Sequence, residues 1–419
     1  MASISAVELA QQIIDDCLRD GTWSNRALDA LIERALDETD EFVARAATRA
    51  FFSIVIERLA DLFEPSLCEI YVRLFTRVIA RAIPDYDADD LVVRYRRISH
   101  VRRFPGGDIS RVFVLSRVTL GADAAVTSVV LAAMKKRFPQ SEICLVGPAK
   151  NTELFADDAR IVSIPVSYSR SGLLRDRLLA VIELHSIVDE PGTIVIDPDS
   201  RLTQLGLIPV CDDARYYFFE SRAFGGFSTL SLPELTAIWL GECFSSGESK
   251  PYVAPILQSK VADIAVSWGV GENAEKRIDD HFEFSILSAL LREGRTVILD
   301  RGAGGEEAAR IDELQRRLNS PLLQVYDGNY AGFASHIVQS ALYVGYDSVG
   351  QHVASAAGVP LISVFAGHPC ERMLSRWRPS GPHARVIAID DTNRSEALAL
   401  TLHAIAEAVG EERSAKPKD

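Results

Sequence analysis

The feature that most constrains this chain is an alternation of short apolar runs and helical stretches that begins at Val112 and continues almost to the C-terminus. Such runs are typical of strands buried on both faces, and strands that alternate with helices form parallel sheets. A polar, proline-containing stretch at 246–260 divides the alternation into two sets. The predicted strands are 112–115, 143–146, 161–166 and 193–196 in the first set, and 264–267, 296–299, 322–326, 343–346, 361–365 and 386–389 in the second.

The residues before this alternation follow a different pattern. Apolar side chains such as Leu9, Ile13 and Cys17 recur at helical spacing, and no strand-like alternation interrupts them. The sequence therefore predicts an α/β protein with two Rossmann-like, doubly wound domains preceded by a helical N-terminal domain. The expected boundaries are 1–105 for a helical accessory domain, 106–248 and 249–410 for the Rossmann-like domains, and 411–419 for a frayed, charged tail.

The charge of the chain narrows its partners. The formal net charge is -13, whereas a nucleic-acid-binding protein usually carries a basic surplus, so no nucleic acid is expected as a partner. One basic cluster, between Arg94 and Arg103, interrupts this acidic background. Two interpretations of the cluster stay open: a solvated helix end, or a contact for an anionic acceptor or a membrane surface.

The cysteines and the N-terminus bear on the compartment. The six cysteines include no Cys-x-x-Cys pair, which predicts reduced thiols and no metal site. The first residues lack the basic start and apolar core of a leader, and the most apolar early stretch, 50–63, contains Glu57, Arg58 and Asp61. We therefore expect a cytoplasmic protein without a transmembrane segment. Peripheral membrane contact and an oligomer formed through the helical domain stay open.

The sharpest local motif follows the predicted strand 343–346. Asp347 and Ser348 precede a helix of small residues, and either side chain can cap that helix. The N-terminus of a helix presents unpaired backbone N–H groups and a partial positive charge, and both suit a phosphate. The alternative is a capped helix that binds no ligand.

This motif resembles the signature of heptosyltransferase-like glycosyltransferases, family 9, which have the two-domain GT-B fold. The residues that match the family pattern are Asp347, Ser348, His352, Gly358 and Pro360, and the apolar strand 361–365 follows them. Val349 stands where the family usually has glycine, and Gly350 comes one position later. The resemblance implies that Asp347, Ser348, Gly350 and His352 help to bind the donor.

Two further segments share this resemblance, which spans about residues 110–390. Gly121, Ala122 and Asp123 follow the first strand of the first α/β domain, and Asp123 matches the aspartate proposed as general base, with Ala122 inserted before it. The alternative for Asp123 is a helix N-cap. A glycine-containing loop at 267–271 precedes Lys276 and Arg277, which match the lysine that reaches the donor phosphates.

The resemblance implies an inverting, metal-independent glycosyltransferase with no cofactor, which moves a hexose or heptose from a nucleotide diphosphate-sugar to an acceptor hydroxyl. The acceptor could be a glycan, a lipid-linked saccharide or a protein, as in the synthesis of bacterial-type cell-surface glycans. Lys276, Ser348 and the helix after Asp347 would neutralise the departing diphosphate, where charge develops. Two alternatives stay open: a sugar-nucleotide epimerase, and a non-catalytic binding or assembly module.

Overall fold

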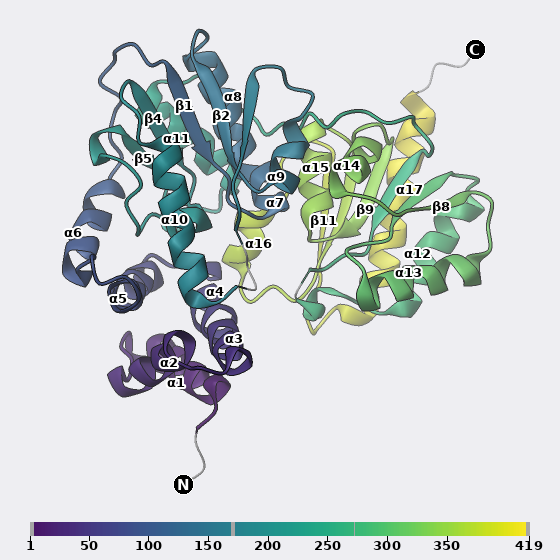
Figure 1. The fold of residues 1–419 in the computed structure, drawn as a ribbon. Helices are drawn as coiled ribbons and strands as arrows, with labels where there is room; N and C mark the ends of the chain where they lie inside the picture. The colour runs from purple at the N-terminus through teal and green to yellow at the C-terminus, as the bar shows by residue number, and fades with distance from the viewer. Residues whose placement is uncertain (1–3, 169–171, 272, 416–419) are drawn as a thin grey trace.

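The computed structural model describes residues 4–168, 172–271 and 273–415, with side chains described up to residue 410 (Figure 1). The chain begins with helices that extend to residue 98. These are α1 (Ala6–Asp20), α2 (Asn25–Leu36), α3 (Glu41–Ala50), the π-helix η1 (Phe51–Ile56), α4 (Glu57–Asp61), α5 (Pro65–Ala82) and α6 (Ala88–Ile98). Because α3, η1 and α4 follow one another without a break, they form one helical rod from Glu41 to Asp61.

A parallel sheet follows, with the strand order β3-β2-β1-β4-β5. Its strands are β1 (Arg111–Leu115), β2 (Glu142–Gly147), β3 (Ile161–Pro165), β4 (Thr193–Asp197) and β5 (Tyr216–Phe218). The helices of this domain are α7 (Leu120–Ala122), the π-helix η2 (Asp123–Thr127), α8 (Ser128–Arg137), α9 (Ala149–Thr152), α10 (Leu174–Val188) and α11 (Leu232–Phe244). The sequence did not predict β5, a three-residue strand at the sheet edge.

The second parallel sheet has the order β11-β10-β9-β6-β7-β8. Its strands are β6 (Ile264–Ser267), β7 (Val297–Asp300), β8 (Leu323–Tyr326), β9 (Leu342–Tyr346), β10 (Leu361–Phe365) and β11 (Ala384–Ala388). Its helices are α12 (Asp280–Arg292), α13 (Gly305–Leu318), α14 (Tyr330–Val338), α15 (Val349–Ala357), α16 (Glu371–Trp377) and α17 (Ala397–Ala415). The predicted fold class, helices followed by two doubly wound α/β domains, is confirmed.

One detail differs from the expected boundaries. The tail expected to fray from residue 411 continues α17 as far as Ala415, because this stretch of sequence consists mainly of strong helix formers. Residues 416–419 lie outside the described residues. The boundary expected at 248 falls in the connection 245–263, where the structure has no helix or strand.

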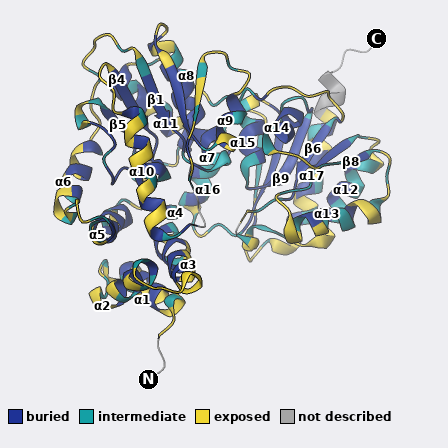
Figure 2. Cartoon of the chain, viewed as in Figure 1, coloured by how far each residue is buried: buried dark blue, intermediate teal, exposed yellow. Residues whose placement is uncertain are grey.

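The N-terminal helices share a hydrophobic core with the first sheet (Figure 2). Alternate residues of β1 point to opposite faces, so Phe113 and Leu115 pack with the N-terminal helices and α10, whereas Val112 and Val114 pack with α8 and α11. The helices therefore cover one face of the sheet. The core on the other face continues into the C-terminal domain through Phe333 of α14.

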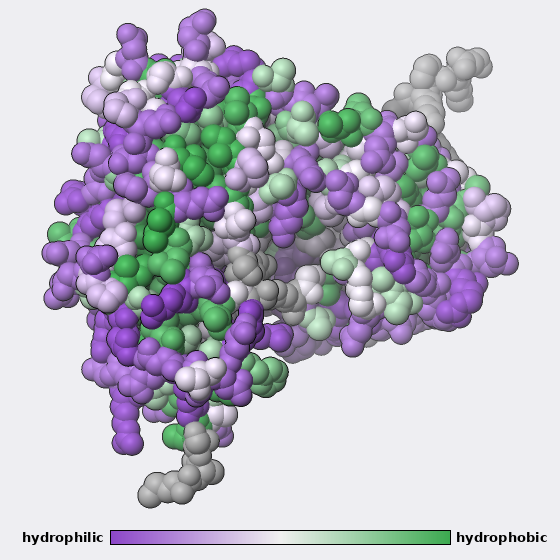
Figure 3. Space-filling view, viewed as in Figure 1, coloured by the Kyte–Doolittle hydropathy of each residue, from purple (hydrophilic) through white to green (hydrophobic). Residues whose placement is uncertain are grey.

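The basic cluster helps to attach these helices to the sheet. Arg94 donates to Asp213 at 2.8 Å and to the carbonyl of Gly206 at 2.9 Å, and Arg102 donates to the carbonyls of Ala214 and Tyr216 at 3.1 Å. Arg94 and Arg102 thus make hydrogen bonds within the fold, rather than forming a solvated helix end. Hydrophilic residues cover most of the face drawn in Figure 3. Among the described residues, no helix is long and apolar enough to cross a bilayer.

Candidate active site

The two sheets place their topological switch points near each other. Ligands of doubly wound folds bind where the strand order reverses, beyond the carboxyl ends of the strands. In the second sheet this point lies between β6 and β9, and in the first between β1 and β4. α7, which follows β1, packs against α15, which follows β9 (Figure 1). A Cβ added to Gly121 of α7 would lie 3.4 Å from the Cα of Val349, so the domains meet with little space between their backbones.

The structure brings Lys276 and Asp347 together at the start of α15. The Nζ of Lys276 donates to Oδ2 of Asp347 at 2.7 Å and to its carbonyl oxygen at 3.3 Å. The pair is shielded from water, with side-chain exposures of 17% for Lys276 and 5% for Asp347. Asp347 also accepts a hydrogen bond from Gln351 at 2.5 Å. Because an ammonium group has three N–H donors, one donor of Lys276 remains for a ligand.

Ser348 occupies the N-cap of α15 but does not cap it with its side chain. Its Oγ is buried near the Tyr343 hydroxyl, but the two make no well-aligned hydrogen bond and Oγ has no other partner among the described residues. A buried hydroxyl without a partner is costly, so an unpaired one at a helix N-terminus is a place where a ligand oxygen would be stabilised. The first amide groups of α15 likewise receive no side-chain cap.

Gly350 has a structural reason to be glycine. A Cβ at this position would lie 2.0 Å from the Oη of Tyr343, closer than any normal contact. The Tyr343 ring therefore occupies the space that a side chain would need. The structure thus gives a packing reason for glycine at this position, and the donor-binding role of Gly350 stays a prediction.

Two other predicted donor ligands are engaged within the protein. Arg277 donates to the buried Glu283 at 2.8 Å and also pairs with Asp280, so its guanidinium group is held by carboxylates of α12. His352 is 6% exposed and makes an edge-on contact with Trp377, with ring centroids 5.6 Å apart. Burial lowers the pKa of His352 to about 4, so the imidazole is neutral at pH 7 and packs at the junction between the domains.

Asp123 is fully buried at the start of the π-helix η2. Its Oδ1 accepts from the backbone N–H of Arg117 at 2.7 Å and from Thr127 at 2.5 Å. Its Oδ2 accepts from Ser116 at 2.6 Å and from Asn151 at 2.5 Å. Burial raises the pKa of this carboxyl group and the four hydrogen bonds lower it. These contacts tie the β1–α7 loop to its surroundings and direct neither oxygen into a cleft.

The residue inserted before Asp123 also has a structural counterpart. A π-helix accommodates one extra residue within a helix, and η2 begins directly after Ala122. The loop before it is strained, because Val118 has φ of 73°, a conformation that β-branched residues rarely adopt. The insertion therefore changes the helix that carries Asp123 as well as its spacing from Gly121.

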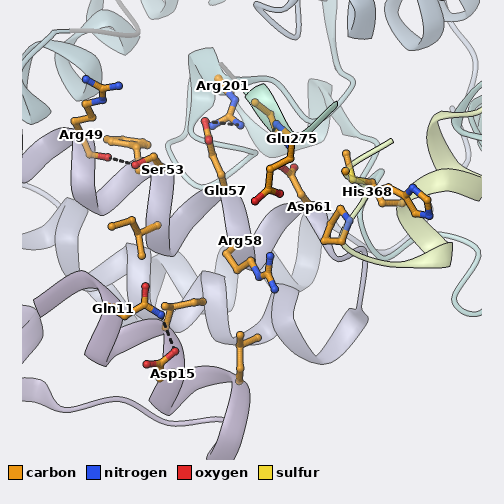
Figure 4. A pocket seen from close by; sticks show the side chains of 18 of the residues that line it. Gln11, Asp15, Arg49, Ser53, Glu57, Arg58, Asp61, Arg201, Glu275 and His368 are labelled. Atoms are coloured by element: carbon orange, nitrogen blue, oxygen red, sulfur yellow. Dashed lines mark hydrogen bonds and ion pairs between the residues drawn. The ribbon is translucent and has the colours of Figure 1, made fainter. Parts of the chain in front are cut away.

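A large cavity of about 1730 Å³ lies between the N-terminal helices and the C-terminal domain (Figure 4). Glu57 and Asp61 of α4 line it together with Arg201, which follows β4. Glu275 and His368 line it from the C-terminal domain. The sequence analysis treated Glu57 and Asp61 only as charges that interrupt an apolar stretch. Their spacing of four residues puts both on one helix face, but the sequence alone does not distinguish such a face from a solvated one.

Comparisons with known proteins bear on the fold. No family model matches the sequence, and no curated protein matches it. The solved structure of E. coli heptosyltransferase WaaC with ADP matches 72% of this chain and 99% of its own, with 14% identity and a TM-score of 0.53. The family 9 glycosyl transferase from Veillonella parvula matches with 16% identity, coverages of 73% and 97%, and a TM-score of 0.54.

A third structure, E. coli ADP-heptose LPS heptosyltransferase II, matches with 16% identity, coverages of 72% and 98%, and a TM-score of 0.51. The chain has the GT-B fold of the heptosyltransferases. The heptosyltransferase structures are matched over almost their whole length. More than a quarter of the present chain has no counterpart in them. No group of three or more metal-ligating side chains occurs in the part of the chain that the structure describes.

Proposed function

We propose that this protein is a glycosyltransferase that moves a sugar from a nucleotide diphosphate-sugar to an acceptor hydroxyl. The observation that carries the proposal is the pair of Lys276 and an uncapped α15, at the switch point of the C-terminal sheet. The GT-B fold supports it, because the solved neighbours with this fold include WaaC with ADP and WaaC with ADP-2-deoxy-2-fluoro heptose. We therefore propose an ADP-linked hexose or heptose as the first donor to test.

The reaction places negative charge on the leaving diphosphate as the bond to the anomeric carbon breaks. The free N–H of Lys276, the Oγ of Ser348 and the first amides of α15 are the donors available to that charge. Fixed donors in a site shielded from water stabilise a developing charge more strongly than water does. Asp347 holds Lys276 in place, so Asp347 acts on the donor through the lysine.

The acceptor enters from the side of the large cleft. Its described lining contains arginines such as Arg58, Arg201 and Arg394 and also the acidic Glu57, Asp61 and Glu275. A lining with both signs of charge offers hydrogen bonds to a polyhydroxylated acceptor without selecting a strongly charged one. We propose that the acceptor is a glycan, free or attached to a lipid or a protein.

The test is a thermal-shift and turnover screen with ADP-glucose, UDP-glucose and GDP-mannose. A donor present at 100 times its dissociation constant should stabilise the protein by about 2.7 kcal/mol. Released nucleoside diphosphate reports turnover, and the sugar product distinguishes transfer from epimerisation of the donor. A donor that binds but is never consumed, over a broad panel of acceptors, would instead favour a binding or assembly module.

Lys276→Met tests the carrying observation. Loss of a charge-assisted hydrogen bond costs about 1.5–3 kcal/mol, so donor binding should weaken roughly 10- to 150-fold. Lys260→Met is the matched control, because Lys260 is exposed in the connection between the domains. The double variant Lys276→Met/Asp347→Asn removes the carboxylate left without its cation and keeps the fold intact for the measurement. Unchanged donor affinity in both Lys276 variants would reject this binding site.

A further inference from the structure

The N-terminal helices form one wall of the large cleft, and Asp61 ends the helix that faces it. α4 presents Leu59 and Ala60 to the core, whereas Asp61 and Glu57, four residues apart, share the face toward the cleft. Figure 4 shows both side chains on α4, with Arg201 next to Glu57, and draws Glu275 and His368 of the C-terminal domain on the side of Asp61. A helix belonging to the N-terminal region therefore contributes acidic groups to the space between the domains.

The backbone after Asp61 is fixed by the C-terminal domain. Phe63 is buried with φ of 53°, a left-handed conformation that is rare for a bulky residue. Its carbonyl oxygen accepts a hydrogen bond from Arg372 of α16 at 2.8 Å, and its ring contacts Trp377. Strained residues held by their surroundings cluster at functional sites. Here the left-handed conformation of Phe63 ends α4, and its contacts with α16 keep Asp61 where the N-terminal helices meet the two α/β domains.

The carboxylate of Asp61 differs from that of Asp123 in its availability. Within residues 4–168, 172–271 and 273–415, no hydrogen bond or ion pair to Asp61 is found, whereas Asp123 accepts four hydrogen bonds. Burial raises the pKa of Asp61, the cations Arg201, Lys276 and Arg117 lower it, and the like charge of Glu57 raises it. Lys276 is thus one of three cations whose charge favours the ionised form of Asp61.

We propose that Asp61 is the general base of the transfer reaction, and that the N-terminal helices complete the acceptor site. The proposal rests on the proposed glycosyltransferase function. It assigns the cleft between α4 and the C-terminal domain to the acceptor, so the helical region is part of the active site.

The transfer is a single displacement at the anomeric carbon of the donor sugar. The acceptor oxygen forms a bond to the anomeric carbon while the bond from that carbon to the diphosphate oxygen breaks. The electron pair of the broken bond leaves with the nucleoside diphosphate, next to Lys276. The acceptor proton passes to a carboxylate oxygen of Asp61, and water exchanges it after the product leaves. No oxidant, reductant or further reactant is needed.

The experiment compares Asp61→Asn with wild type, using release of nucleoside diphosphate from the donor that gives the largest thermal shift, with water and a monosaccharide panel as acceptors. A general base contributes about 10²- to 10⁴-fold, so kcat should fall by that factor while the donor dissociation constant stays within about twofold. The wild-type kcat should fall at low pH as Asp61 becomes protonated, and the variant should lack this limb. Glu64→Gln, an exposed site beyond α4, is the control.

The outcomes separate the two proposals. Wild-type turnover that Asp61→Asn leaves unchanged overturns the base assignment and leaves the transferase standing. Wild-type protein that binds donors without ever releasing nucleoside diphosphate overturns both. A variant that loses kcat, donor binding and melting temperature together shows that Asp61 supports the fold and overturns its role as base. Because burial disfavours the charged carboxylate, we expect Asp61→Asn to melt at or above the wild-type temperature.

Discussion

Asp123 provides the sharpest test of where the base lies, because resemblance and geometry disagree about it. Each of its carboxylate oxygens accepts two hydrogen bonds. Asp123→Ala would leave four donors without an acceptor, and two of them, the Arg117 N–H and the Asn151 amide, cannot rotate to new partners in place. At about 1–3 kcal/mol for each buried unsatisfied group, the loss of stability should be about 2–6 kcal/mol.

Asp123→Asn should cost much less. Oδ1 can keep the Arg117 and Thr127 donors, while the new NH₂ group replaces Oδ2. The Oδ1 atom of Asn151 is buried without a partner, so a flip of that amide would let it accept from the new NH₂ group. The Ser116 hydroxyl can also rotate. One imperfect hydrogen bond remains, for a cost of about 1 kcal/mol.

The assay is chemical denaturation of both variants beside their kcat values. If Asp123 positions the β1–α7 loop, Asp123→Asn should keep kcat within about tenfold of wild type. Asp123→Ala should show a clear loss of stability in denaturant. The reasoning fails if Asp123→Asn melts like wild type, binds donor normally and still loses kcat by about 10²-fold or more. That result would restore Asp123 as the base and remove Asp61.

Two further predictions concern the C-terminal site. Gly350→Ala would place its Cβ 2.0 Å from the Tyr343 Oη and should destabilise the protein by about 1–3 kcal/mol in denaturant melts, with partial recovery in Gly350→Ala/Tyr343→Leu. Burial raises the pKa of Asp300 to about 6, so the folded protein holds a proton that the unfolded chain releases near pH 4. The free energy of unfolding should therefore fall by up to about 3 kcal/mol as pH rises from 4 to 6, and Asp300→Asn should flatten that slope.

The strands of both sheets were predictable because each is a local signal. A run such as Val112–Leu115 is apolar on both faces whatever lies beside it, and its flanking turns bound it. β5 was missed because Tyr216–Phe218 is only three residues long and pairs with β4 alone. The π-helices were not predicted, because each is a short segment of five or six residues beside α-helix and leaves no distinct apolar pattern in the sequence.

The candidate site was predictable to the extent that its chemistry is local. The start of α15 could be identified from Asp347 and Ser348, because the end of the strand, the capping residues and the start of the helix are adjacent in the sequence. The resemblance placed Lys276 and Asp347 at the same donor, but their direct contact was not predicted, because the two residues are distant in sequence. The contacts of Gly350 with Tyr343 and of Arg277 with Glu283 were not foreseen, because these residues become neighbours only in the folded protein.

Neither the local sequence pattern nor the family resemblance could identify Asp61 as a functional residue. The resemblance begins near residue 110, so nothing in it points to α4. A carboxylate four residues from another on a helix reads as a solvated face unless the cleft is known. Burial and repulsion by Glu57 both disfavour the ionised form of Asp61, so the charged pair does not stabilise the fold. The place of Asp61 in the lining of the cleft is more economically explained by chemistry than by stability, because a purely structural role would tolerate a neutral residue there.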